Sequence, residues 1–483
     1  MIKLDPAWGG NIVIQRGLDN KCRVRVSGRF TGTPTNIEAR VVDAGGSAVS
    51  GLDWFTLVAN ASINFRDGTF DGVFIMDAKT FAMRVQVRFS NATGTTAQSG
   101  FIYTGDVFPL WGQSNMEGFV GLKAGSTLAK SVPSLICVTD AAEASALGMS
   151  GTTLWQGTTG DGIITLANAI GAYTGYPVGF IFVARGGIPM VKDSALVTAN
   201  PAKYILSTEG SIDRFPLEAF LTKATNFIRQ SCAQNGNGTD FFGSVMIHGE
   251  QDAIATALLA YSDGLTRLQN IQKALVPRAR ADRMPFFLTI VGKYDTNDVG
   301  VNRIASAMLQ WAATAPNAVA CGDRYDLPRS ADGLEVHLTP GGHTTLARRL
   351  GMDILHWIDP ATNTVPGRGP FLDTASRSAA VITATINLNG HTAVAKESGG
   401  SPTGFQVSSD DFATLRTINS VGLSGVTLTI TLASSPGATP CKLRYVSTNA
   451  AGDATDNLIY STDAITGDAL GAPLSLTRLP LGV

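Results

Sequence analysis

The sequence predicts an α/β protein whose central three-layer α/β/α domain, built on a parallel sheet, is flanked at both ends by β-rich, sandwich-like modules. Residues 1–104 alternate apolar and polar positions with period two in short bursts, which is typical of half-buried strands. Residues 105–362 instead alternate apolar runs of strand length with amphipathic segments of helix length, the pattern of a parallel sheet covered on both faces. The β pattern returns in residues 363–483, so we expect three domains with these bounds.

Composition excludes several classes of protein. A chain of 483 residues has room for about three domains at roughly 100–200 residues each. Because 37 Lys and Arg balance 38 Asp and Glu, no net field attracts nucleic acid or an anionic membrane surface. No run approaches the ~18 apolar residues of a membrane span, so we expect no membrane insertion. With 44% hydrophobic residues the chain can bury large cores, and we expect a soluble folded protein.

The expected elements follow in order along the chain. In the first module, residues 22–26 and 83–89 alternate strictly between turn residues such as Gly, Asn, Thr and Asp. In the central domain we expect strands at 178–183, 243–247, 286–291 and 318–320, and helices at about 161–174, 217–234, 256–275, 300–315 and 340–358. A loop rich in Thr, Pro and Gly over 361–370 precedes predicted strands at 381–386, 426–432 and 442–446.

The chain carries no signature of a metal or cofactor site. Its five cysteines are scattered without a C-x-x-C pair, which argues against a zinc cluster or a disulfide framework and favours small core residues. The glycine-rich turns lack the Lys-Ser/Thr pair of a phosphate loop. We therefore expect no metal and no cofactor.

Three loops that follow predicted strands carry candidate catalytic residues, because ligands of open α/β sheets bind beyond the carboxyl ends of the strands. The first loop contains Ser114, the second Gly186 and Gly187, and the third reads His248-Gly-Glu-Gln-Asp252. A serine at a strand-to-helix turn exposes its hydroxyl beside backbone amides that can stabilise an oxyanion. The alternatives are a helix N-cap, a tight turn and a solvated polar loop, respectively.

Histidine is the usual general base at neutral pH, and the chain has five. We expect His391 at a surface turn, His356 in the core or at its boundary on the last central helix, and His343 on the surface of that helix.

His337 differs from the other histidines because it lies just before that helix with two carboxylates upstream. Either Asp332 or Glu335 can orient an imidazole through its second ring nitrogen. Ser114, His337 and one of these acids are therefore a candidate nucleophile, base and orienter.

These motifs resemble the conserved blocks of the SGNH hydrolases, and within them the sialate O-acetylesterase-like carbohydrate esterases. Gly112-Gln-Ser-Asn-Met116, preceded by Gly105-Asp-Val, looks like the nucleophile block, and Gly186-Gly187 is similar to the second block. His248-Gly-Glu-Gln-Asp252 resembles the third and Val336-His-Leu-Thr-Pro340 the last. More loosely, residues 11–28 and 443–474 are similar to the leading and closing β segments of these esterases. The resemblance implies a flavodoxin-like hydrolase domain and, by order of parts, covers nearly the whole chain.

The resemblance implies roles for individual residues. Ser114 would be the acyl-accepting nucleophile and His337 its base. The amides of Ser114 and Gly187 would stabilise the oxyanion. Gly186, Gln113 and Glu250 would lie beside them in the oxyanion or substrate site.

Two positions depart from the family's pattern. His248 stands where the family usually has a Gln that points a donor toward the oxyanion, and an imidazole can still donate. The family places Asp two or three residues before the histidine, but here those positions hold Glu335 and Leu334, and Asp332 lies further ahead. We favour Asp332 as the orienter, with Glu335, or a dyad without either acid, as the alternatives.

The resemblance implies a metal-independent serine esterase that removes O-acetyl groups from a carbohydrate, sialate or a polysaccharide, through an acyl-enzyme. An O-acetylated carbohydrate is the expected partner. We expect a secreted, periplasmic or virion-associated protein rather than a cytoplasmic one. The rival hypotheses are a glycan-binding or structural virion or cell-surface protein with a secondary or inactive hydrolase site, and a lipase or thioesterase of the same superfamily.

Overall fold

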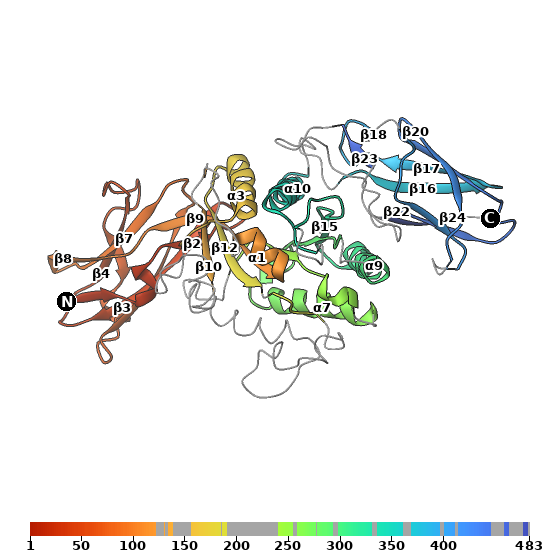
Figure 1. Cartoon of the computed structure of the whole chain (residues 1–483). Coiled ribbons are helices and arrows are strands. Elements are labelled where there is room, and N and C mark those ends of the chain that lie inside the picture. The colour runs from red at the N-terminus through yellow and green to blue at the C-terminus, as the bar shows by residue number, and fades with distance from the viewer. Residues whose placement is uncertain are drawn as a thin grey trace.

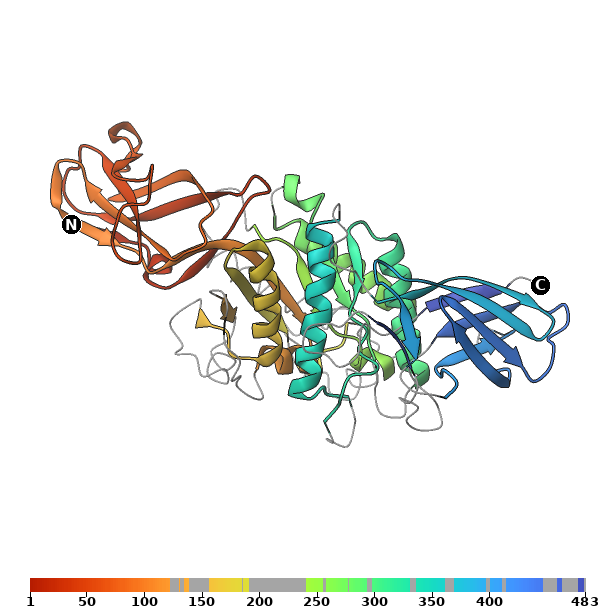
Figure 2. The ribbon, with the colours of Figure 1, turned by 90° about the horizontal axis from the view of Figure 1, so that it is seen from above.

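The structure is a computed structural model of the whole chain. It describes residues 1–121, 130, 134–138, 156–184, 186–190, 240–254, 258–276, 278–292, 298–330, 336–360, 369–396, 400–410, 414–445, 458–462 and 477–481. Figure 1 shows an N-terminal β region, a central region of strands and helices, and a C-terminal β region, with the two termini at opposite ends. Figure 2 shows the same succession from above.

The N-terminal region consists of short strands in two sheets. Its strands are β1 (Ile2–Leu4), β2 (Ile12–Gln15), β3 (Lys21–Phe30), β4 (Ile37–Asp43), β5 (Phe55–Val58), β6 (Thr69–Asp77), β7 (Met83–Phe89) and β8 (Ala92–Gln98). One sheet has the order β1-β3-β6, and in the other β4 pairs with β5 and β7, and β7 with β8. Alternate residues of β3 and β7, such as Val24, Val26, Val85 and Val87, are fully buried in one core. The period-two pattern thus gives the expected β-rich, sandwich-like region.

β9 (Ile102–Gly112) links this region to the central one. Its first residues pair with β2, from Ile12 opposite Ile102 to Gln15 opposite Gly105. Its later residues pair with the parallel strand β12 (Val178–Ala184), from Asp106 onward. The domain boundary expected after residue 104 therefore falls within a continuous strand, and the backbone passes from one region to the next without a loop.

The central region is built on parallel strands in the order β10-β12-β9-β13-β14-β15, with β11 antiparallel at the edge beside β10. The remaining elements of this region are β10 (Ser134–Val138), β11 (Gln156–Gly157), β13 (Ser244–Ile247), β14 (Phe286–Thr289), β15 (Ala318–Cys321), α1 (Ser114–Val120), α3 (Asp161–Thr174), α7 (Leu258–Lys273), α8 (Arg278–Ala281), α9 (Asp298–Thr314) and α10 (Pro340–Ile358). The strands and helices expected here are present with ends shifted by a few residues at most, except for the helix at 217–234, which lies outside the described residues.

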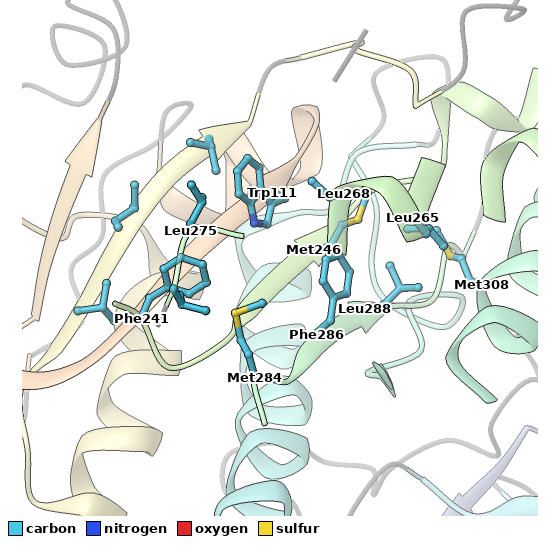
Figure 3. Close-up of a cluster of buried hydrophobic side chains, with 14 of the residues drawn as sticks. Trp111, Phe241, Met246, Leu265, Leu268, Leu275, Met284, Phe286, Leu288 and Met308 are labelled. Carbon is cyan, nitrogen blue, oxygen red and sulfur yellow. The ribbon is translucent and has the colours of Figure 1, made fainter. Parts of the chain in front are cut away.

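Alternate side chains of the central strands enter two different cores, because successive residues of a strand point to opposite faces. Phe108 and Leu110 pack with residues of α1, α3 and α10, such as Phe119, Ile163 and Leu346. Trp111, Met246 and Phe286 instead pack with Leu265 and Leu268 of α7 and Met308 of α9, as Figure 3 shows. Helices therefore cover both faces of the parallel strands, and the carboxyl ends of these strands remain as the edge where a site can form.

The C-terminal region contains only strands among its described residues. They are β16 (Phe371–Ser378), β17 (Val381–Asn387), β18 (Val394–Lys396), β19 (Phe405–Ser408), β20 (Ile418–Ser424), β21 (Thr427–Leu432), β22 (Cys441–Tyr445), β23 (Ile459–Ser461) and β24 (Thr477–Leu481), in sheets of the order β16-β17-β21-β20, β18-β23 and β19-β22-β24. Side chains join this region to the central one: Tyr460 donates to Asp326 Oδ2 at 3.2 Å, and the Tyr445 and Tyr325 rings meet edge to face at 6.0 Å.

Two further expectations concern burial and membranes. Cys22, Cys321 and Cys441 are buried and free, as expected of small core residues, while the side chains of Cys137 and Cys232 lie outside the description. Within the described part of the chain, no helix has both the length and the apolar character needed to cross a bilayer.

Candidate active site

Ser114 is the first residue of α1 and follows the carboxyl end of β9 directly. The turn depends on Gly112, whose φ of 156° is unfavourable for other residues, and a Cβ there would lie 2.1 Å from the carbonyl oxygen of Ile247. The Gln113 amide donates to that same carbonyl at 3.3 Å. Gln113, not Ser114, is the N-cap of α1. The Ser114 hydroxyl is thus presented at the end of the sheet rather than used as a cap.

The Ser114 hydroxyl meets the imidazole of His337, although the two residues are far apart in the sequence. His337 Nε2 lies 2.8 Å from Ser114 Oγ, and both residues are half-buried. His337 precedes α10, whose first turn is capped by the Thr339 side chain, an acceptor from the Gly342 amide at 3.1 Å. A hydroxyl hydrogen-bonded to an imidazole is the pair required for base-assisted nucleophilic attack.

Asn115 fixes the position of His337 relative to Ser114. Its side-chain Nδ2 donates to the carbonyl of Val336 at 3.0 Å, and its Oδ1 accepts from the amide of Leu338 at 2.9 Å. The residue next to the serine therefore holds the backbone on both sides of the histidine.

Glu250, fully buried after β13, fixes the residues on both sides of Ser114. Its carboxylate accepts from Gln113 Nε2 at 2.8 Å and from Asn115 Nδ2 at 2.7 Å. The buried guanidinium of Arg324 also donates to it. Burial alone would raise the pKa of Glu250, but Arg324 and the Asn115 hydrogen bond hold that pKa below its usual value. Glu250 is thus a buried anion that supports the turn on which Ser114 lies.

The loop after β12 brings two glycines to the same edge of the sheet. The Gly186 amide donates to Glu117 Oε1 of α1 at 2.5 Å, so this amide is already engaged. Gly187 has φ 70°, in the left-handed region that favours glycine. Within the described residues, its amide has no hydrogen-bond acceptor.

His248 is fully buried and holds this glycine loop. Its Nε2 lies 2.9 Å from the Ile188 carbonyl, and its Nδ1 lies 3.1 Å from the Tyr261 hydroxyl. Burial lowers the pKa of His248 to about 4, so the ring is neutral at pH 7. Because a carbonyl only accepts, the ring proton resides on Nε2, and Nδ1 accepts from Tyr261. Both ring nitrogens are therefore engaged with protein groups.

A second residue of the same segment supports the loop. Asp252 Oδ2 accepts from the Met190 amide at 2.8 Å. Glu117, His248 and Asp252 thus hold the backbone of the loop at successive points around Gly187.

The other predicted residues have different outcomes. Asp332 and Glu335 lie outside the described residues, so the identity of the orienter stays a prediction. The expectation that His343 and His391 lie at the surface is wrong, because each is only 4% exposed. Helix α10 turns the His343 ring inward over Gly118 and against the edge of Phe119. His356 is half-buried, as expected of a residue at the core boundary.

Sequence reasoning missed the residues that support the site. Asn115 and Glu117 lie in the same motif as Ser114, so the sequence indicates that they are close to it. It does not indicate their hydrogen-bond partners, which lie far away along the chain. Arg324 offers no local signal. It follows β15 and reaches Glu250 only because β13, β14 and β15 are neighbours in the sheet.

Comparison with known proteins gives a likeness of structure but none of sequence. No protein-family model matches the chain, and no curated protein matches it. The structure is similar to that of a carbohydrate acetylesterase from Xanthomonas citri, at 16% identity and a TM-score of 0.66, over 99% of each chain. Two further structures match over about half of this chain. A protein from Arabidopsis thaliana has 17% identity and a TM-score of 0.35, over 52% of this chain and 97% of its own. NanS has 11% identity and a TM-score of 0.37, over 53% of this chain and 98% of its own. The first likeness shows a shared fold over the whole chain, and we draw no argument from the two lower scores.

Proposed function

We propose that this protein is a serine esterase that removes O-acetyl groups from a carbohydrate, with a central domain of the three-layer SGNH type. The observation that carries the proposal is the 2.8 Å contact between Ser114 Oγ and His337 Nε2 at the carboxyl edge of a parallel sheet. The whole-length fold shared with a carbohydrate acetylesterase supports the choice of substrate.

The reaction follows from these positions. His337 Nε2 removes the hydroxyl proton as Ser114 Oγ bonds to the acetyl carbonyl carbon, and the amides of Ser114 and Gly187 stabilise the resulting oxyanion. Collapse of this intermediate breaks the bond to the sugar oxygen, which takes the proton from His337. Water then attacks the carbonyl carbon of acetylated Ser114 while His337 removes a proton from the water. The bond between that carbon and Ser114 Oγ breaks, His337 returns the proton to Oγ, and acetate leaves.

We assign His248, Glu250 and Gln113 to positioning in this reaction. Glu250 and Gln113 hold the nucleophile turn, and His248 holds the Gly187 loop through Ile188. Gly186 serves the same loop through Glu117. We further propose that the functional domains are residues 1–104, 105–362 and 363–483.

The test is release of acetate from p-nitrophenyl acetate and from a panel of acetylated glycans. We expect Ser114→Ala and His337→Ala to abolish turnover, because each removes a reacting group. Of Asp332→Asn and Glu335→Gln, we expect the first to be the severe one. A wild-type protein that binds glycan but releases no acetate from any substrate would reject the esterase in favour of a binding protein.

A further inference from the structure

A cavity of about 60 Å³ lies directly beside the candidate dyad. Ser114 and His337 form part of its wall, and Asn115, Gly118, Asp161, Leu338, Pro340 and His343 complete the described lining. The cavity is therefore bordered by the first turn of α1 and by the N-terminal ends of α3 and α10, and it is partly open to solvent.

The size of this cavity limits what it can hold. An engineered protein cavity of about 150 Å³ accepts benzene, so a volume of 60 Å³ has room for two or three heavy atoms. The methyl and carbonyl carbons of an acetyl group fit within that limit. A sugar ring, which is larger than benzene, does not.

We propose that this cavity is the acyl subsite, and that His343 and Gly118 close it so that only two-carbon acyl groups are accepted. This inference rests on the proposed esterase function, and it names which part of the substrate enters the protein. The sugar then stays outside the cavity, on the open side of Ser114, where His337 can return the proton to its oxygen.

His343 and Gly118, which both line the cavity, pack directly against each other. A Cβ on Gly118 would lie 2.4 Å from His343 Nε2, so the imidazole rests directly on the backbone of α1. Gly118 follows Ser114 by one helical turn and lies on the same side of α1. His343 is only 4% exposed, and its ring meets Phe119 edge to face at 6.3 Å. The imidazole is therefore in contact with the backbone of α1 on one side and with the Phe119 ring on another.

The experiment compares acyl chain lengths on one leaving group. For the wild-type enzyme, kcat/KM is measured for p-nitrophenyl acetate, propionate and butyrate. We expect butyrate to be at least tenfold poorer than acetate, because each added methylene that a pocket must reject is worth roughly tenfold or more. His343→Ala enlarges the cavity and should reduce this acetate preference at least tenfold.

Two controls separate specificity from general damage. His356→Ala removes a half-buried histidine near the other end of α10 and should leave the acetate-to-butyrate ratio unchanged. The ratio of kcat/KM for p-nitrophenyl and naphthyl acetate should also be unchanged in His343→Ala, because the alcohol does not enter the cavity. Thermal unfolding verifies that each variant is folded.

Each outcome decides the inference. Equal wild-type rates for acetate and butyrate overturn it and leave the esterase proposal intact, and this arm needs no variant. A folded His343→Ala enzyme with an unchanged preference also overturns it. The inference is also overturned if His343→Ala hydrolyses all three esters more slowly by the same factor. That result would indicate that the cavity holds the water that attacks the acyl-enzyme, and not the acyl chain. If the wild type hydrolyses none of the three esters, the esterase proposal fails and the acyl subsite fails with it.

Discussion

At the scale of single residues, the candidate site depends on buried polar side chains that do not touch the reacting atoms. Glu250 is the central one, because its carboxylate binds both neighbours of Ser114 as well as Arg324. Asn115 extends the same support to His337. A buried charge of this kind is stabilising only while every partner is present.

Glu250→Gln tests this dependence. The substitution keeps the shape of the side chain but leaves the Arg324 guanidinium buried without a counter-charge, which costs about 3–5 kcal/mol. We expect a clear fall in Tm and in kcat, measured by thermal unfolding and by acetate release. Glu38→Gln is the matched control, since Glu38 pairs with Arg88 in a partly exposed position and should cost about 1 kcal/mol or less. Equal losses in the two variants would contradict this view of Glu250.

His248 predicts how stability depends on pH. Its pKa is about 4 in the folded protein and ~6.5 when unfolded, so the unfolded state binds more protons between these values. Stability is therefore lost as the pH falls from about 6.5 toward 4, by about 2 kcal/mol between pH 7.5 and pH 5.

Thermal unfolding across this pH range measures the effect. His248→Gln should flatten the dependence between pH 5 and 7, whereas His356→Gln, at a half-buried position, should leave it in place. An unchanged slope in His248→Gln would show that other groups cause the acid sensitivity.

At the scale of elements, the close approach of β9 and β13 decides where Ser114, the proposed nucleophile, lies. Gly112 ends β9 against the Ile247 carbonyl with no room for a side chain. The short helix α1 begins two residues later, so the position of its first residue, Ser114, is fixed relative to the sheet.

Gly112→Ala should displace this turn. Its Cβ would lie 2.1 Å from a backbone oxygen at a φ of 156°, and the strain and forced strand movement should cost about 3 kcal/mol or more and lower kcat strongly. Gly94→Ala in the exposed strand β8, where a Cβ meets nothing within 4 Å, is the control and should leave Tm nearly unchanged. If both variants have the Tm of the wild type, the turn accepts a side chain at position 112 and the prediction is wrong.

Elements were predictable where local pattern determines them, as for α3 and α10, whose bounds match the expected ranges. The proximity of Ser114 and His337 was predictable because both residues lie in compact motifs, while their catalytic roles stay a prediction. The role of His248 was not, because its burial and its bond to Ile188 depend on how β12 and β13 flank β9. The inward turn of His343 depends likewise on packing against α1, which periodicity along one helix does not reveal.

At the scale of the whole molecule, the two β regions join the central one by different means. The N-terminal region shares β9 with it, and the buried Arg280 side chain donates to the Arg16 carbonyl at 2.7 Å, while Arg16 pairs with Asp106 at 2.8 Å. The C-terminal region makes side-chain contacts such as that of Tyr460 with Asp326.

Removing each β region in turn tests this difference. Deleting residues 1–101 strips β2 and β7 from β9 and leaves Asp106 without Arg16, so we expect an insoluble or aggregated product. Deleting residues 363–483 should leave a soluble enzyme with a lower Tm that still releases acetate. Soluble yield and size-exclusion chromatography measure both outcomes, and a soluble, active protein without residues 1–101 would contradict the expectation.

The passage of β9 through both regions also has a mechanical consequence. A hydrogen-bonded strand is stiff along its length, and this one runs from the N-terminal sheet to the residue before Gln113 without a hinge. The orientation of Ser114 is therefore set relative to the N-terminal sheet. Under the proposed esterase function, Ser114 cannot turn independently of the N-terminal region, so a large glycan would have to approach in an orientation that suits both regions.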